Sequence, residues 1–337
     1  METNPQQKQI VLDLYRDFQK ICADNNLTYF AVSGTGLGAV LWNGIIPWDD
    51  DMDIALPAED YLKFCDICKK KLPKHLSFTE YIWFGGKLHD NRTMFTNVYY
   101  ITDPDMYNGV FLDIVPLIGL PDDENERQAF IDKLWYFHNN SMLYEMYGRG
   151  LDAKTTLTSL KKERRNILTA YKYDKVEFVM DFSNAINVYR SEGFRNPIDF
   201  KFENSTIPVP STYEENFAIQ YGKWSKYPPK EQRQSVHDEL GILDLNRSYR
   251  EYQKDFKKLS PFAQKALRIK HANEYYVTKS NIIMSDQVKL LSKNWAEATT
   301  QAEYYKNRGA VRHAASKVKQ NAKKLLSMRA KFTHKDK

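Results

Sequence analysis

The chain has 337 residues and a formal net charge of +6, and 42% of its residues are hydrophobic. This composition excludes an intrinsically disordered chain, because it supplies enough apolar surface for one large core with appended helices. No stretch approaches the roughly 18 apolar residues of a membrane span, and residues 1–9 lack the features of a signal peptide, so we expect a cytoplasmic protein.

The first predicted elements are a helix, a strand and a second helix. Residues 7–25 carry apolar side chains at helical spacing, which predicts an amphipathic helix that packs on a core. Residues 28–32 form a β-rich run, and the sequence Ser-Gly-Thr-Gly at 33–36 predicts a tight turn after it. A short helix then follows over residues 37–41.

Two later strands are predicted to carry acidic residues. Residues 51–56 alternate acidic and apolar side chains, so Asp51 and Asp53 should project from one side while Met52 faces the core. Residues 109–115 form a second strand pattern, in which Asp113 lies between apolar neighbours. A strand interior normally excludes an unpaired charge, so this carboxylate is expected to be a third metal ligand or a general base.

The rest of the chain is predicted to be mainly helical. A helix over residues 60–72 contains Cys65 and Cys68, which we interpret as buried thiols because no second Cys or His pair completes a zinc site. Helical patterns continue to about residue 185, residues 196–236 show little periodicity, and residues 247–330 are again helical. We expect a catalytic domain over residues 1–245 and a helical, basic extension over residues 246–337.

The acidic segment indicates a metal site. Asp49, Asp50, Asp51 and Asp53 would repel one another unless a cation compensated, and a divalent metal with oxygen ligands is the simplest solution. We expect Mg²⁺, or Mn²⁺. The alternative is a solvated acidic turn that caps a hairpin, although the alternating apolar residues argue against it.

The Ser-Gly-Thr-Gly turn indicates a phosphate-binding site. Ser33, Gly34 and Thr35 offer backbone amides and hydroxyls at the start of a helix, where the helix dipole favours an anion. A phosphate cradle and a pair of metal ligands within about 30 residues together suggest phosphoryl transfer.

These segments resemble the LicD family. The resemblance rests on Phe30-Ala-Val-Ser-Gly-Thr-Gly-Leu-Gly-Ala-Val40 and Gly44-Ile-Ile-Pro-Trp-Asp-Asp-Asp-Met-Asp-Ile54. Three later segments extend it: residues 87–93, residues 109–116, and Tyr221-Gly-Lys-Trp with the prolines at 228 and 229. It covers roughly residues 7–240.

The resemblance implies an α+β fold of the nucleotidyltransferase type, with a small mixed sheet flanked by helices and a helical C-terminal extension. It also implies transfer of phosphorylcholine from CDP-choline, or of a related alcohol phosphate from another CDP-alcohol, to a glycan. The acceptor would be a sugar of a cell-surface glycan, of a lipid-linked glycan or of teichoic acid. Related proteins of the fukutin type transfer ribitol phosphate.

Individual residues match the family pattern. Asp51 and Asp53 match the metal-binding pair, Asp113 matches the third acid, and Lys87 matches a basic position expected to face the donor phosphates. The chain departs from the pattern at Ser33, Gly36 and His89. We expect His89 to lie on the donor side, and the alternative is a surface histidine that is hydrogen-bonded to Asp90.

A choline headgroup would be bound by aromatic side chains, and many are available. The candidates are Tyr81, Trp83, Phe84, Tyr99, Tyr100, Tyr107, Tyr221, Trp224 and Tyr227. Most of them are expected to fill the core or to stabilise loops, and Trp83 and Trp224 are the preferred exceptions.

The basic charge is concentrated in the tail. Residues 301–337 hold 11 Lys and Arg against two acidic residues, a local charge of +9. A basic helix over residues 310–328 suggests peripheral contact with an anionic membrane, and a solvated helix is the alternative. Nucleotidyl transfer from a nucleoside triphosphate and non-enzymatic polyanion binding are the competing functions, and the net-acidic remainder of the chain argues against a nucleic-acid partner.

Overall fold

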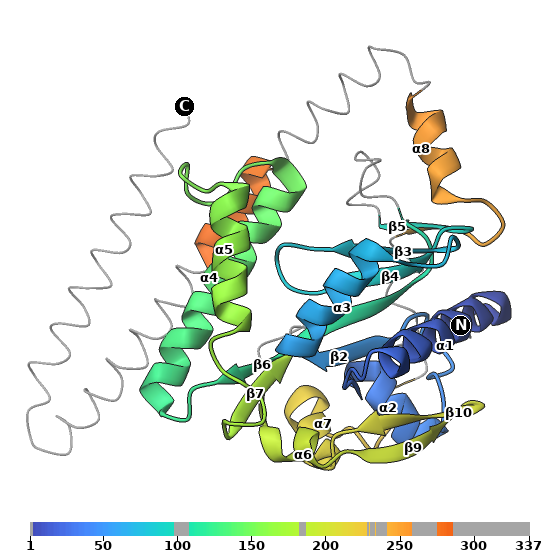
Figure 1. Ribbon diagram of the computed structural model, residues 1–337, viewed down its shortest axis with the longest axis horizontal. Coiled ribbons are helices and arrows are strands. Elements are labelled where there is room, and N and C mark those ends of the chain that lie inside the picture. The colour runs from blue at the N-terminus through green and yellow to red at the C-terminus, as the bar shows by residue number, and fades with distance from the viewer. Residues whose placement is uncertain are drawn as a thin grey trace, which may run out of the picture. The chain divides into compact units, whose positions relative to one another are not determined.

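The computed structural model describes residues 3–97, 108–181, 187–227, 229, 233, 241–257 and 275–285. The chain divides into two compact units, Met1–Asn273 and Glu274–Lys337. In the second unit the structure describes one helical segment, residues 275–285 (Figure 1). The predicted basic helix and the whole of residues 301–337 lie outside the described residues.

The first unit is a mixed α/β structure. Its helices are α1 (Pro5–Asp24), α2 (Ser33–Trp42), α3 (Ala58–Lys70), α4 (Glu124–Tyr147), α5 (Leu157–Leu168), α6 (Ser191–Arg195), α7 (Tyr213–Tyr221) and α8 (Tyr249–Lys257). Its strands are β1 (Phe30–Ala31), β2 (Asp53–Pro57), β3 (Leu76–Glu80), β4 (Gly86–Asp90), β5 (Met94–Asn97), β6 (Phe111–Leu120), β7 (Phe178–Asp181), β8 (Asn187–Arg190), β9 (Ile198–Phe202), β10 (Ser205–Val209) and β11 (Gly241–Asp244).

Seven of these strands form the main sheet. Its path is β1-β2-β6-β4-β3, and β7 continues from the distal half of β6 and pairs with β8. The β2–β6 pair is parallel, and the other pairs are antiparallel. The described part of the chain also holds two smaller pairs, β9–β10 and β5–β11.

Strand β6 contains Pro116, although proline is normally excluded from a central strand. The N–H of Asp113 points to β2, where it donates to the Met52 carbonyl, so the nitrogen of Pro116 faces the opposite edge. Pairing with β4 ends at Ile114 and pairing with β7 begins at Ile118. The proline therefore lies between two partners and removes no hydrogen bond from either.

The two faces of the sheet carry different clusters of apolar side chains. Ile54, Leu112 and Ile114 belong to the larger core, which α1 and α3 cover (Figure 1). Ala55 and Val115 point to the opposite face and belong to a smaller cluster. Because side chains alternate along a strand, Asp53 and Asp113 share this second face, at the ends of β2 and β6.

Most of the elements predicted for the N-terminal third are confirmed, with shifted bounds. The residues predicted to form a turn at 33–36 are instead the first turn of α2, and Asp51 precedes β2. The predicted burial of Cys65 and Cys68 is also confirmed: within the described residues both are buried free thiols, and Cys22 is a third.

Several elements further along the chain were missed. The expectation of helices up to about residue 185 is wrong for β7, and the region 196–236 contains the β9–β10 hairpin and α7. The predicted extension begins at residue 246, whereas the first compact unit runs to Asn273 and includes α8. Among the described helices, none has the length and apolar character needed to cross a bilayer.

Candidate active site

Three carboxylates converge at the start of the two parallel strands. Asp53 opens β2 and lies in register with Asp113 of β6, and Asp51 precedes β2 by two residues. One carboxylate oxygen from each of the three residues lies within 4.8 Å of the other two. The acids that the sequence singled out are therefore brought together by strand register.

The loop before β2 adds more negative charge. Asp49, Asp50 and Asp51 form a second group whose carboxylate oxygens lie within 4.8 Å of one another. The start of the chain fixes this loop, because Thr3 Oγ1 donates to the Asp49 carbonyl at 2.6 Å and Gln7 Nε2 donates to the Asp50 carboxylate at 3.5 Å. Asp51 belongs to both groups and joins the loop to the strands.

The electrostatics of Asp53 fit a divalent cation. Burial raises its pKa well above the usual range, and the negative charges of Asp51, Asp113, Asp49 and Asp181 raise it further. A clustered, partly buried set of carboxylate oxygens is the donor set that Mg²⁺ and Mn²⁺ prefer, and a bound cation would remove the repulsion. Asp51, Asp53 and Asp113 are the residues that would hold it.

Asp181 is a site residue that the sequence analysis missed. It is the last residue of β7, is 2% exposed and adds to the negative potential at Asp53. The segment Phe178-Val-Met-Asp181 is too short to show a strand period. Its acid becomes recognisable only when β7 pairs with β6.

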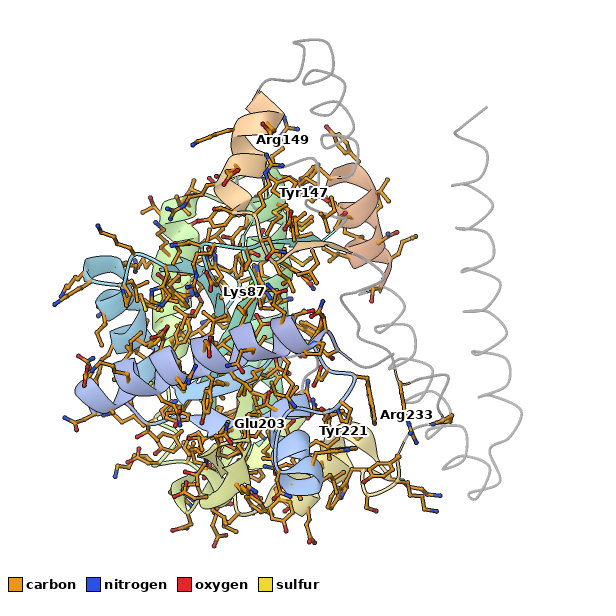
Figure 2. The ribbon with its side chains drawn as sticks, turned by 90° about the vertical axis from the view of Figure 1, so that its right-hand side faces the viewer. Lys87, Tyr147, Arg149, Glu203, Tyr221 and Arg233 are labelled. Carbon is orange, nitrogen blue, oxygen red and sulfur yellow. The ribbon has the colours of Figure 1, made fainter. Side chains whose placement is uncertain are left out.

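Lys87 supplies positive charge beside the third acid. Its Nζ lies 2.8 Å from Asp113 Oδ1 and 2.9 Å from Oδ2, and 3.2 Å from the centroid of the Phe111 ring (Figure 2). The Lys87 side chain is 19% exposed, so its ammonium is held in place and is still accessible to a ligand. The structure therefore places Lys87 beside Asp113, and its predicted position facing the donor phosphates stays a prediction.

The residues predicted to cradle a phosphate form the first turn of α2. Ser33 has a φ of +48° and accepts a hydrogen bond from Gln220 Nε2 of α7, and Thr35 Oγ1 accepts from the Asp53 N–H at 2.7 Å. A Cβ at Gly34 would lie 2.6 Å from Asp49 Oδ2, so only glycine admits that carboxylate to the helix start. In this structure Asp49 faces the position at which an anion was expected, and the phosphate-binding role stays a prediction.

His89 lies two residues beyond Lys87 on the same face of β4, but its ring is enclosed. It is 2% exposed, Nδ1 accepts from the Gly109 N–H at 3.4 Å, and Nε2 lies 3.1 Å from Thr79 Oγ1. Burial and the nearby Lys87 and Arg250 lower its pKa to about 3. The alternative of a surface histidine bonded to Asp90 is wrong, and donor contact by His89 stays a prediction.

Tyr221, labelled in Figure 2, is the last residue of α7 and interacts electrostatically with Asp53 and Asp49. Burial raises the pKa of its hydroxyl, and the negative charges of Asp53 and Asp49 raise it further, although the residue as a whole is 41% exposed. A neutral phenol in this position offers a hydrogen-bond donor at the rim of the acidic cluster.

The two preferred headgroup candidates pack against other rings. Trp83 stacks on Tyr81 with ring centroids 5.1 Å apart and an interplanar angle of 14°. Trp224 packs against Phe217 and Tyr213 of α7. Tyr99, Tyr100 and Tyr107 lie outside the described residues.

A different set of rings lies beside the acidic loop, and two of them contact a cation. Trp42 packs on Trp48 at 5.6 Å and on Tyr227 at 4.9 Å between centroids. The Arg233 guanidinium lies 5.2 Å from the centroid of the Trp48 ring and 5.6 Å from that of Tyr227. We call Trp42, Trp48 and Tyr227 the aromatic group, and it adjoins the carboxylates because Trp48 directly precedes Asp49.

Comparison with known proteins identifies this part of the chain. Residues 26–147 match the family model described as LicD/FKTN/FKRP, nucleotidyltransferase domain. These residues are similar to the nucleotidyltransferase domain of the LicD family. The matched region contains the three converging acids and Lys87, so the LicD domain and the candidate site coincide.

Individual relatives extend the match. The lipopolysaccharide cholinephosphotransferase LicD of Haemophilus influenzae is 21% identical over 257 residues, which cover 69% of this chain and 95% of that protein. Uncharacterized proteins of Rickettsia typhi and Rickettsia prowazekii are 46% and 49% identical over 54 and 47 residues, which cover 18% of each relative.

Proposed function

We propose that the protein is a metal-dependent transferase that moves phosphorylcholine, or a related alcohol phosphate, from a CDP-activated donor to a sugar hydroxyl of a cell-surface glycan. The convergence of Asp51, Asp53 and Asp113 beside Lys87 is the observation that carries this proposal. The relation to a protein named as a cholinephosphotransferase supports the group transferred.

The carboxylate cluster suits a pyrophosphate donor only when a cation is present. Mg²⁺ or Mn²⁺ bound by Asp51, Asp53 and Asp113 would neutralise the cluster and stabilise the charge that develops on the bridging oxygen of the donor. Lys87 adds a fixed positive charge at the same edge of the sheet. Its ammonium can pair with a phosphate oxygen while it remains beside Asp113.

The reaction we propose is a displacement at the distal phosphorus. An oxygen of the sugar acceptor forms the new P–O bond, the bond to the bridging oxygen breaks, and CMP leaves with the bonding electrons. Asp113 accepts a hydrogen bond from the attacking hydroxyl, and either takes its proton or orients it while the proton passes to water. Asp113 already accepts a hydrogen bond from Lys87 and would also hold the metal, so we favour the orienting role.

The aromatic group supports a donor whose alcohol carries a positive charge. Trp48 and Tyr227 hold the Arg233 guanidinium against their rings, and a quaternary ammonium is bound by the same electrostatic attraction. Choline and ethanolamine carry this charge, whereas glycerol and ribitol do not. We therefore place the donor headgroup at the aromatic group.

The decisive experiment measures CMP release by the full chain. The protein is incubated with Mg²⁺, a panel of glycan acceptors and CDP-choline, CDP-ethanolamine, CDP-glycerol or CDP-ribitol, beside the Asp51→Asn/Asp53→Asn variant. Asp132→Asn, on the exposed side of α4, is the matched control. CMP release that requires Mg²⁺ and is lost only in the double variant would establish the activity and name the donor.

Two other outcomes would contradict the proposal. Release of pyrophosphate from a nucleoside triphosphate, with no CMP from any CDP-alcohol, would show nucleotidyl transfer. If neither product forms and calorimetry detects no metal-dependent binding of a donor, the protein has no phosphotransferase role.

A further inference from the structure

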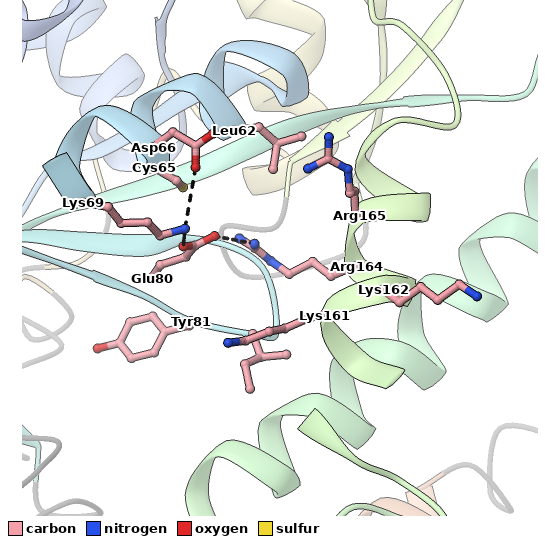
Figure 3. A pocket seen from close by; sticks show the side chains of 11 residues that line it. Leu62, Cys65, Asp66, Lys69, Glu80, Tyr81, Lys161, Lys162, Arg164 and Arg165 are labelled. Atoms are coloured by element: carbon pink, nitrogen blue, oxygen red, sulfur yellow. Dashed lines mark hydrogen bonds and ion pairs between the residues drawn. The ribbon is translucent and has the colours of Figure 1, made fainter. Parts of the chain in front are cut away.

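We propose that a cavity between α3, β3 and α5 is a second binding site, which takes a phosphate-bearing anion and is separate from the transfer site. The cavity has a volume of about 470 Å³ (Figure 3). This lies within the range of ligand pockets, which is about 300–1,000 Å³. Its wall carries five cationic side chains, from Lys69, Lys161, Lys162, Arg164 and Arg165.

Among the described residues, carboxylates pair with two of these cations and leave the other three without an ion pair. Glu80 lies between Lys69 and Arg164 and pairs with both, at 2.7 and 2.5 Å (Figure 3). The second acid of the wall, Asp66, lies 3.8 Å from Lys69. No ion pair joins the three exposed cations of α5 to any carboxylate in the described part of the chain. These are Lys161, Lys162 and Arg165.

The inner wall contains a guanidinium with an unused donor. Arg164 is 8% exposed; it donates to Glu80 and, through its second terminal nitrogen, to the Tyr61 hydroxyl at 3.0 Å. Its Nε is buried and has no hydrogen-bond partner among the residues that the structure describes. A buried donor without a partner is costly, and the residue that carries it lines the cavity.

The cavity and the acidic cluster lie on opposite faces of the sheet. Glu80 shares a face of β3 with Phe78, whose ring packs on Phe64 of α3. Thr79, between them, points the other way and lies in register with Lys87, on the face of the acids. An anion in the cavity therefore does not occupy the space of the transferred group.

The shared chemistry of the ligand is one or more phosphate groups, because compact polyanions match a cluster of Lys and Arg donors. Such a group can belong to a free molecule or to the headgroup of an anionic lipid. Sodium pyrophosphate represents the first source, and vesicles that contain phosphatidylglycerol represent the second.

The test uses the full chain in EDTA, so that the metal-dependent site does not contribute. Pyrophosphate binding is measured by calorimetry for the wild type and for Lys161→Gln/Arg165→Gln. The control Arg16→Gln/Lys20→Gln removes two equally spaced cations from the exposed side of α1. We expect the cavity variant to bind at least about tenfold more weakly, as the loss of one charge-assisted hydrogen bond predicts, and the control to bind as the wild type does.

Vesicle sedimentation identifies the source of the phosphate. Pelleting with phosphatidylglycerol vesicles, but not with phosphatidylcholine vesicles, that is lost in the cavity variant and kept in the control would assign a lipid headgroup. Pyrophosphate binding without such pelleting would assign a free ligand. The proposal is overturned if neither probe binds, or if the cavity variant binds both as tightly as the control does.

The test is independent of the transferase activity. Asp51→Asn/Asp53→Asn should keep the pyrophosphate binding measured in EDTA. The cavity variant should keep the Mg²⁺-dependent binding of the CDP-alcohol donor, because its two substitutions lie on the other face of the sheet.

Discussion

The ammonium of Lys87 lies 2.8 Å from the carboxylate of Asp113, and the two residues are direct neighbours on β4 and β6. Asp113 is in turn in register with Asp53 on β2, and Lys87 with Thr79 on β3. One row across four strands therefore runs from acid to acid to cation to hydroxyl. The sheet register sets the order of charges in the site.

This row predicts the effect of removing its cation. Lys87→Met should lower kcat/KM for the donor by about 100-fold, the loss that follows removal of one preorganised electrostatic contact in an active site. Lys87→Arg keeps the charge beside Asp113 and should recover part of the activity. Steady-state kinetics of CMP release would measure both, with Lys20→Met on α1 as the control. Equal activity of the Met and Arg variants would contradict an electrostatic role.

Because the acids repel one another, we predict that the site lowers the stability of the native state when no cation is bound. The folded-state pKa of Asp53 is raised, so its ionised form destabilises the native state at every pH above the unfolded pKa, near 3.9. In EDTA at pH 7.5, Asp53→Asn should therefore stabilise the protein by about 1 kcal/mol, or roughly 2–4 °C in Tm. Thermal unfolding would measure the shift.

Added Mg²⁺ should reverse the order of stability of the wild type and Asp53→Asn. A ligand that binds only the native state stabilises it by mass action, so millimolar Mg²⁺ should raise the Tm of the wild type. Asp51→Asn/Asp53→Asn should show no such rise, and Asp132→Asn should behave as the wild type does. A double variant that is less stable than the wild type in EDTA would show that the carboxylates are paired within the protein.

The acids of the site could be predicted because their signals are local. Asp53 and Asp113 each lie in a run of apolar residues, so their strands and their exposed sides follow from a period of two. The parallel pairing of β2 with β6 was not visible in the sequence, because register depends on contacts between distant segments. It was nevertheless required for the two carboxylates to meet.

Other features of the site depend on tertiary structure alone. Asp181 lies at the end of a four-residue strand that is recognisable only beside β6. Helix α2 begins at Ser33, which has a positive φ. Serine rarely adopts this conformation, so the sequence does not predict it. The aromatic group forms because Trp42 and Trp48 flank one turn of the chain and Tyr227 approaches from beyond α7.

A pH dependence is predicted for Glu145 of α4. Its carboxylate accepts from the Ile82 N–H at 2.7 Å, and burial raises its pKa from 4.5 to about 7. The unfolded chain ionises this group from pH 4.5 upward and the folded chain only near pH 7, so the stability of the wild type should fall across this window. Glu145→Gln removes the titration and keeps an oxygen to accept from Ile82.

Denaturant unfolding at several pH values would test this expectation. At pH 4 the Glu145→Gln variant and the wild type should be equally stable, and above pH 7 the variant should be more stable by up to about 3 kcal/mol, the equivalent of the shift. Asp132→Asn, on the exposed side of the same helix, should show no such window. A difference between Glu145→Gln and the wild type that is constant with pH would mean that Glu145 acts through packing.

The aromatic group predicts how donors are discriminated, on the condition that the proposed transfer is observed. Trp48→Ala removes one of the two rings that hold the Arg233 guanidinium, and a cation–π contact is worth about 0.5–2 kcal/mol. The KM for CDP-choline should therefore rise by about tenfold, while the KM for CDP-glycerol, which has no cationic headgroup, should change little. Trp83→Ala, in the stacked pair with Tyr81, is the matched control and should leave the ratio of the two KM values unchanged. An equal rise for both donors in Trp48→Ala would mean that the ring supports the neighbouring acidic loop, because a headgroup contact changes only the KM of the charged donor.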